Sequence, residues 1–121
     1  MARILIVDDS VSISRMLQRR LKKSGHEVYT AENGKIGVEM ALSFNPDLTL
    51  MDMHMPVLNG YEATAYLRNQ GYEGKIYALT ASAMAHEANK SIESGCDGFL
   101  SKPVLEDFEK TLISILEKKR G

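Results

Sequence analysis

Ionisable and hydroxyl side chains stand at the ends of the apolar segments of this sequence. Asp8 and Asp9 follow the first segment directly, and Asp52 closes the third. Thr80 ends the fourth segment, and Lys102 follows the fifth. Singly, each residue has an ordinary structural explanation, as a helix cap, a turn residue, a strand residue or an exposed lysine. Their recurrence at one kind of position favours a shared site with three carboxylates, a hydroxyl and an ammonium group.

Three neighbouring carboxylates require a cation. Two carboxylates about 4 Å apart repel each other by about 1 kcal/mol in water and about 4 kcal/mol at an effective dielectric constant of about 20. Oxygen ligands favour a hard ion such as Mg²⁺, which binds through one or two carboxylates, water and phosphoryl oxygens. A zinc site is not expected, because the three histidines have no ligand-like spacing to one another or to the lone cysteine: His26, His54, His86 and Cys96.

A metal ion beside a carboxylate, faced by a lysine and a hydroxyl, is suited to transferring a phosphoryl group onto that carboxylate. The metal ion and Lys102 would hold the negative charge of the phosphoryl oxygens, and Thr80 would donate a hydrogen bond to one of them. Asp52 is the expected nucleophile, because it stands alone at the end of its segment. Asp8 and Asp9 are the expected metal ligands, directly or through water.

The apolar segments have the length and composition of buried strands, and helical patterns separate them. Strands are expected at Arg3–Val7, His26–Thr30, Asp47–Asp52, Lys75–Thr80 and Gly98–Leu100. Helices are expected from Val11 to before Ser24, from Gly34 to before Pro46, from Tyr61 to Asn69, from Ala85 to Glu93 and from Glu106 to Lys118. This alternation predicts an α/β fold whose parallel sheet is covered on both faces. The carboxyl ends of the strands would share one edge, where ligands bind.

The composition is that of one folded domain, expected to span residues 1–121. Because 15 Lys and Arg are balanced by 16 Asp and Glu, for a net charge of −1, no basic surface for nucleic acid is expected. Cys96 is the lone cysteine, so no internal disulfide can form, which fits a reducing compartment. No apolar stretch is long enough for a bilayer and no leader is evident, so we expect a cytoplasmic protein without a membrane partner.

Four groups of residues are highly specific when they occur together. They are Ile4-Leu5-Ile6-Val7-Asp8-Asp9, Met51-Asp52-Met53-His54-Met55-Pro56 followed by Asn59-Gly60, Ala78-Leu79-Thr80-Ala81, and Phe99-Leu100-Ser101-Lys102-Pro103. On these residues the whole chain resembles the response-regulator receiver domain of two-component signalling. The resemblance implies a flavodoxin-like, doubly wound five-stranded sheet with strand order 2-1-3-4-5 and five helices.

The resemblance also implies roles for the acidic residues. Asp52 would be the phosphoacceptor. Asp8 and Asp9 would bind Mg²⁺ together with Asp52 and the backbone carbonyl of His54. Such a domain would catalyse only its own phosphorylation and dephosphorylation, and so would not be an enzyme with a turned-over substrate.

By the same resemblance, Thr80 and Phe99 would form a switch pair that responds to phosphorylation. His54 and Ser82, two residues beyond Asp52 and Thr80, would tune how long the phosphoryl group persists. The phosphate would come from a sensor histidine kinase or a histidine phosphotransfer protein. A downstream effector would bind the face made by the helix after Thr80, the strand that holds Phe99 and the closing helix.

Three other functions fit the sequence less well. A nucleotide-binding module would need a Gly-rich loop after the first strand, and neither G-x-G-x-x-G nor G-x-x-x-x-G-K-[ST] occurs. A small Mg²⁺-dependent phosphatase with an aspartate nucleophile is the main alternative. It would be expected to have a cap domain, and by resemblance to such enzymes it would carry an acid/base Asp where His54 stands. A module that binds partners without being phosphorylated is the third alternative. The only argument against it is that the full set of site residues is present.

Overall fold

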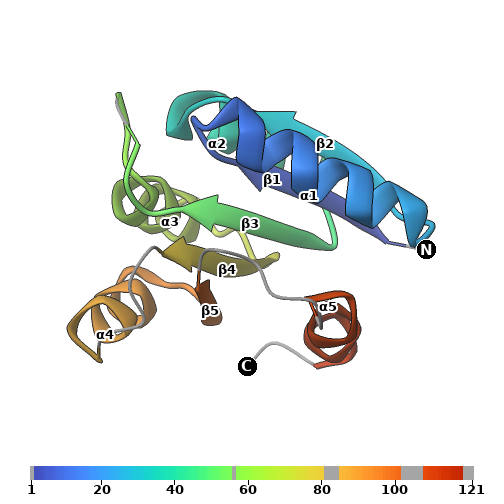
Figure 1. Cartoon of the computed structure of the whole chain (residues 1–121). Coiled ribbons are helices and arrows are strands. Elements are labelled where there is room, and N and C mark those ends of the chain that lie inside the picture. The colour runs from blue at the N-terminus through green and yellow to red at the C-terminus, as the bar shows by residue number, and fades with distance from the viewer. Residues whose placement is uncertain (1, 56, 81–84, 102–107, 119–121) are drawn as a thin grey trace.

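A five-stranded parallel sheet forms the middle of the protein, with helices on both faces (Figure 1). The computed structural model describes residues 2–55, 57–80, 85–101 and 108–118. The strands are β1 (Arg3–Val7), β2 (Glu27–Ala31), β3 (Leu48–Asp52), β4 (Lys75–Thr80) and β5 (Gly98–Ser101). The helices are α1 (Val11–Lys23), α2 (Gly34–Phe44), α3 (Gly60–Asn69), α4 (Ala85–Ser94) and α5 (Phe108–Glu117). The strands lie in the order β2-β1-β3-β4-β5, so the expected doubly wound fold is confirmed.

Several element boundaries differ by a residue from the expected ones. β2 begins at Glu27, which pairs with Arg3 of β1. His26, the expected first residue of this strand, accepts a hydrogen bond at its Nδ1 atom from the Ala2 N–H, 3.1 Å away. The expected start of the last helix, Glu106, lies outside the described residues.

Two hydrophobic cores lie on opposite faces of the sheet, because successive strand side chains alternate in direction. One core lies between the sheet and helices α1 and α5. Its members include Ile4, Ile6, Leu50 and Leu79 from the strands and Leu17, Leu21, Phe108 and Leu112 from the helices. The other core lies between the sheet and helices α2 and α3. Its members include Leu5, Val7, Met51 and Ala78 from the strands and Val38, Ala41, Ala63 and Leu67 from the helices. Burial on both faces explains why the strand segments are apolar without alternation.

Side-chain caps fix the first turns of the three helices that follow β1, β2 and β3. Ser10 Oγ accepts the Ile13 N–H at 3.4 Å at the start of α1. Asn33 caps α2 in the same way. Asn59 and Glu62 form a reciprocal capping box at the start of α3. The caps satisfy helix amides and hold the loops at the carboxyl edge of the sheet in defined conformations.

A close approach between α3 and β3 requires a glycine at residue 60. A Cβ atom added there would lie 2.3 Å from the backbone oxygen of Asp52 and 2.8 Å from the Cα atom of Met53. The Gly60 N–H also donates to the Met53 oxygen at 3.1 Å. The missing side chain therefore lets α3 begin directly against the end of β3.

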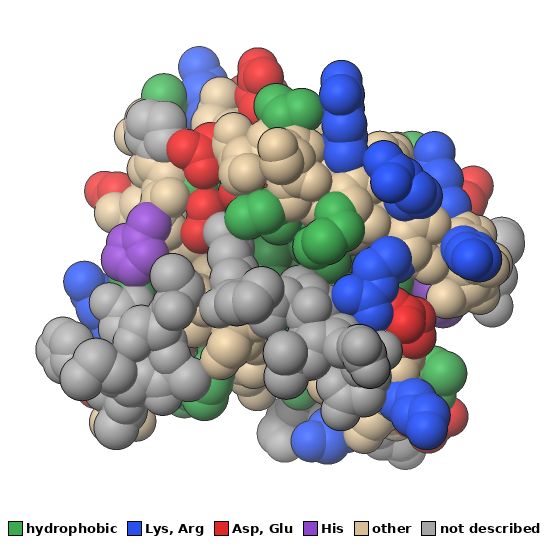
Figure 2. Space-filling view, in the orientation of Figure 1, with side chains coloured by type: hydrophobic (Ala, Val, Ile, Leu, Met, Phe, Trp, Pro, Cys, Tyr) green, Lys and Arg blue, Asp and Glu red, His purple; other side chains and the backbone are tan. Residues whose placement is uncertain are grey.

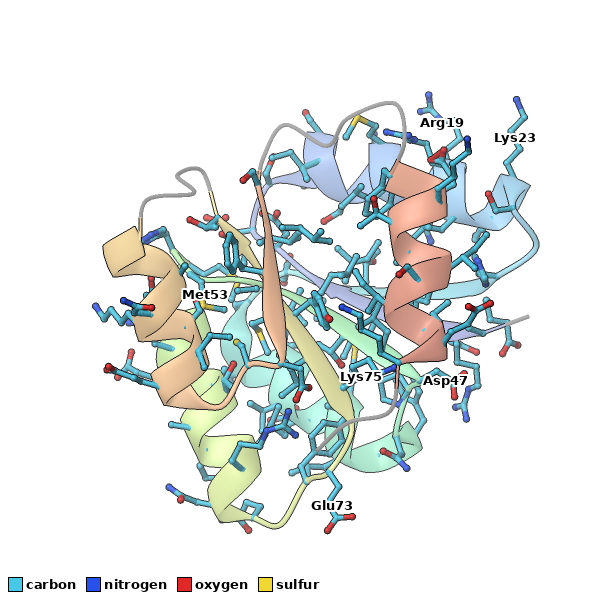
Figure 3. The ribbon with its side chains drawn as sticks, turned by 90° about the horizontal axis from the view of Figure 1, so that it is seen from below. Arg19, Lys23, Asp47, Met53, Glu73 and Lys75 are labelled. Atoms are coloured by element: carbon cyan, nitrogen blue, oxygen red, sulfur yellow. The ribbon has the colours of Figure 1, made fainter. Side chains whose placement is uncertain are left out.

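The ammonium group of Lys75, the first residue of β4, holds the end of α5. Its Nζ atom donates to the carbonyl oxygens of Ile115 at 2.6 Å and Leu116 at 3.3 Å, and to that of Lys118. Figure 3 shows Lys75 beside the last turn of α5. Carbonyls in the last turn of a helix lack the usual helical donors, and a cation at this end interacts favourably with the helix dipole. The Ile115 carbonyl also accepts the Lys118 N–H at 3.3 Å.

We predict that Lys75→Met lowers the free energy of unfolding by about 1–2 kcal/mol, because the α5 carbonyls lose a charged hydrogen-bond donor. Urea unfolding measures the loss, and amide hydrogen exchange should rise most in α5. The control is Lys23→Met, since Lys23 is an exposed cation at the end of α1. Equal stability of the two variants would contradict this role for Lys75.

Candidate functional site at the carboxyl edge of the sheet

Three carboxylates meet at the carboxyl ends of β1 and β3. Oxygen atoms of Asp8, Asp9 and Asp52 all lie within 4.8 Å of one another. Asp8 is 2% exposed and Asp52 is 4% exposed, whereas Asp9 faces solvent. The register explains the meeting, because Val7 pairs with Met51 and the next residue of each strand is an aspartate. The sequence-based expectation that these residues share one edge is thus met.

Backbone N–H groups stabilise the two buried carboxylates. The Ser10 N–H donates to Asp8 Oδ1 at 2.9 Å, and the His54 N–H donates to Asp52 Oδ1 at 3.3 Å. Each donor is two residues after its acceptor, so the loop after each strand turns back over the carboxylate. Hydrogen bonds to ionised groups are stronger than those between neutral groups, so these two N–H groups offset part of the repulsion among the carboxylates.

The donor set fits a hard divalent cation. All three side chains offer carboxylate oxygen, and no histidine or cysteine belongs to the group. Two ligands are buried and one is exposed, which leaves an open side for water or a phosphoryl oxygen. The oxygens of Asp8, Asp9 and Asp52 are therefore placed so that they could hold a metal ion.

The structure places part of the expected catalytic and switch set. Thr80 is fully buried at the end of β4, one residue after Leu79, which pairs with Asp52. Thr80 therefore lies at the same sheet edge as the acidic group. Phe99 lies on β5 opposite Ala78 and is 37% exposed. Lys102 and Ser82 lie outside the described residues.

The sequence did not identify an aromatic contact of His54. Its ring lies 6.0 Å from the ring of Tyr61 on α3, at an interplanar angle of 77°. Lys90 of α4 in turn places its Nζ atom 4.4 Å from the centroid of the Tyr61 ring. No periodic pattern could have revealed this group, because its members come from a loop and two different helices.

A cleft beside Asp8 was also not expected. It has a volume of about 230 Å³ and is lined by α1, the end of β2 and the following loop. Arg15 on α1 and Glu32 after β2 bring opposite charges to its walls. Both residues look like ordinary exposed charges in the sequence, because only the position of the edge strand brings them together.

Charge is unevenly distributed around this edge. Acidic side chains gather at the end of the sheet where α1 begins, and Lys and Arg side chains gather toward the other end of α1 (Figure 2). The exposed cations of this helix are Arg15, Arg19, Lys22 and Lys23. No helix in the described part of the chain combines the length and apolar character needed to cross a bilayer.

Comparison with known proteins gives a consistent result. The family model of the response regulator receiver domain matches residues 4–114. Protein PilH of Pseudomonas aeruginosa is 40% identical over 119 residues, which is 96% of this chain and 98% of PilH. The sensor histidine kinase RcsC of Escherichia coli is 33% identical over 96% of this chain, but the match covers 12% of RcsC.

A solved structure agrees with the sequence relatives. The chemotaxis protein CheY4 of Vibrio cholerae superimposes with a TM-score of 0.88 at 33% identity. The match covers 95% of this chain and 98% of CheY4. The likeness therefore includes the whole sheet and its helices, and not just the strands that carry the acidic group.

We predict that Asp52→Asn stabilises the protein by about 1 kcal/mol when divalent ions are removed, because one of three close negative charges is lost. Added Mg²⁺ should then stabilise the original protein more than the variant, since an ion bound to the folded state adds to its stability. Thermal melts in chelator and in Mg²⁺ measure both effects. The control is Glu73→Gln, which changes an exposed acid remote from the site. It should neither stabilise the protein in chelator nor reduce the stabilisation by Mg²⁺. Clear destabilisation by Asp52→Asn in chelator would contradict repulsion in the site.

Proposed function

The chain belongs to the response regulator receiver domain family, and from that premise we propose that it accepts a phosphoryl group on Asp52 from a phosphohistidine. The observation that carries the assignment is the meeting of Asp8, Asp9 and Asp52 within 4.8 Å, with Asp52 nearly buried at the end of the central strand. The family model covers residues 4–114, and we extend the single receiver domain to residues 1–121.

In the proposed transfer, a carboxylate oxygen of Asp52 attacks the phosphorus atom. The bond between phosphorus and the donor imidazole nitrogen breaks, and its electron pair returns to that nitrogen, which takes up a proton. Asp8, Asp9, Asp52 and the His54 carbonyl would hold Mg²⁺, which when bound offsets the charge of the phosphoryl oxygens. Lys102 is proposed to contact the same oxygens.

Thr80 is proposed to respond to the new phosphoryl group. Its hydroxyl would move to donate a hydrogen bond to a phosphoryl oxygen, since a charge-assisted bond is roughly twice as strong as a neutral one. Phe99, 37% exposed and one strand away, would then turn inward. Burial of its remaining exposed area contributes about 0.5–1 kcal/mol, which shifts a two-state population roughly two- to fivefold.

The proposed effector surface comprises α4, β5 and α5. The position of α5 on this surface is fixed from two sides, by Lys75 at its end and by Arg20 of α1 near its start. The Arg20 guanidinium donates to both carboxylate oxygens of Glu109, at 2.6 and 3.1 Å. This hydrogen bonding holds the pKa of Glu109 below its usual value. These two contacts hold α5 in place on the proposed effector surface.

The remaining assignments concern partners and place. We propose a sensor histidine kinase or a histidine phosphotransfer protein as the phosphate donor, a cytoplasmic location, and no nucleic-acid or membrane partner. A phosphatase that turns over an external substrate is not favoured, because the matching family and relatives are response regulators and receiver-containing proteins. His54 and Ser82 are proposed to tune the lifetime of the phosphoryl group.

We predict that a small phosphodonor with Mg²⁺ adds one phosphoryl group to the protein and none to Asp52→Asn. Intact mass measures the gain. Asp47→Asn, changed just before the opposite end of the same strand, should be labelled like the original protein. Full labelling of Asp52→Asn would exclude Asp52 as the acceptor.

We also predict that beryllofluoride, as a phosphoryl mimic with Mg²⁺, changes amide chemical shifts at Thr80, at Phe99 and along α5. Phe99 and α5 lie away from the acidic group, so a response there requires a conformational change. Asp52→Asn is the control and should respond at none of them. Shifts confined to the loops after β1 and β3 would contradict the proposed switch.

A further inference from the structure

Three side chains from three different segments form a continuous contact beside the acceptor. Tyr61 is 8% exposed in the first turn of α3. The ring of His54, in the loop after β3, is nearly perpendicular to it with the centroids 6.0 Å apart. The Nζ atom of Lys90 on α4 lies over the Tyr61 ring, 4.4 Å from its centroid. Both distances and the 77° ring angle are those of attractive aromatic and cation–π pairs.

The His54 end of this contact reaches the site itself. The His54 N–H donates to Asp52 Oδ1 at 3.3 Å, so the backbone that carries the imidazole is fixed to the acceptor carboxylate. The His54 residue is exposed to solvent. An exposed side chain normally samples several rotamers, and a packed aromatic neighbour restricts that freedom.

We propose that Tyr61 is a positioning residue which, together with Lys90, holds the His54 imidazole beside Asp52 and thereby lengthens the life of the phosphoryl group. The proposal rests on the proposed function of Asp52. A ring held in one place covers the approach to the phosphorus atom for more of the time than a ring that rotates freely. In this role Tyr61 acts through His54.

The affected step is hydrolysis of the acyl phosphate. A water oxygen attacks phosphorus, the bond from phosphorus to the Asp52 oxygen breaks, and its electron pair restores the carboxylate. Both protons of the water remain on the released phosphate. Water must approach opposite the departing carboxylate oxygen, so a fixed imidazole on the solvent side slows this step without taking part in it.

The same contact makes the lifetime depend on α4. Lys90 is an exposed residue of α4, and Tyr61 belongs to α3. A partner that binds α4 and draws Lys90 away from the ring would loosen His54 and shorten the lifetime.

Hydrolysis rates of a set of variants test the proposal. Each protein is phosphorylated with a small phosphodonor and Mg²⁺, the donor is removed, and loss of the phosphoryl group is followed by intact mass. Tyr61→Leu should lose it about two- to tenfold faster, which corresponds to the usual strength of an aromatic pair. Lys90→Met should lose it about two- to fivefold faster. Tyr61→Phe keeps the ring and should restore the original rate within about twofold.

Matched controls separate positioning from general loss of structure. Tyr66→Leu removes an exposed tyrosine of the same helix, and Lys23→Met removes an exposed lysine of α1, so neither should change the rate. In a protein that carries His54→Ala, adding Tyr61→Leu or Lys90→Met should have no further effect, because the imidazole they act through is gone.

Specific outcomes would overturn the proposal. They are an unchanged rate in Tyr61→Leu and Lys90→Met, a slower rate in either, or the same acceleration with and without His54→Ala. If Tyr61→Leu does not fold, Lys90→Met with and without His54→Ala decides the question, because Lys90 is exposed. Failure of the original protein to be phosphorylated would instead refute the proposed function of Asp52.

Discussion

Repulsion among three close carboxylates is the constraint on which the design of this protein depends. Asp8 and Asp52 are nearly buried, and oxygen atoms of Asp8, Asp9 and Asp52 lie within 4.8 Å of one another. In a flexible chain, their repulsion would drive these carboxylates apart. The parallel pairing of β1 and β3 supplies the rigidity, since both strands are buried on both faces. Backbone donors from the following loops offset part of the cost. A bound cation would offset the rest of the repulsion.

The fold and the acidic group follow from short-range features of the sequence. Five apolar runs separated by helical patterns specify alternating parallel strands, and an aspartate directly after a run must lie at the carboxyl edge. Asp8, Asp9 and Asp52 could therefore be placed together without coordinates. The strand order came from family resemblance, because local patterns do not state which strands are neighbours.

Contacts between elements could not be predicted in the same way. The carbonyls at the end of α5 are held by Lys75, a residue 40 positions away that reads as an ordinary strand-end lysine. The pairing of His54 with Tyr61 and Lys90 depends on how α3 and α4 pack. Such contacts depend on side-chain direction and on helix position, which a hydrophobic pattern does not fix.

A close-packed edge also explains how a small chemical change can reach a distant surface. Gly60 brings α3 against the Asp52 backbone, and β4 pairs with β3 up to the residue before Thr80. The closely packed residues around Asp52 would not shift gradually in response to added charge there, because packed interiors move between discrete arrangements. Phe99 has room to move, because it is partly exposed on the edge strand β5. If Asp52 is phosphorylated as proposed, we therefore expect the response to reach β5 through Phe99.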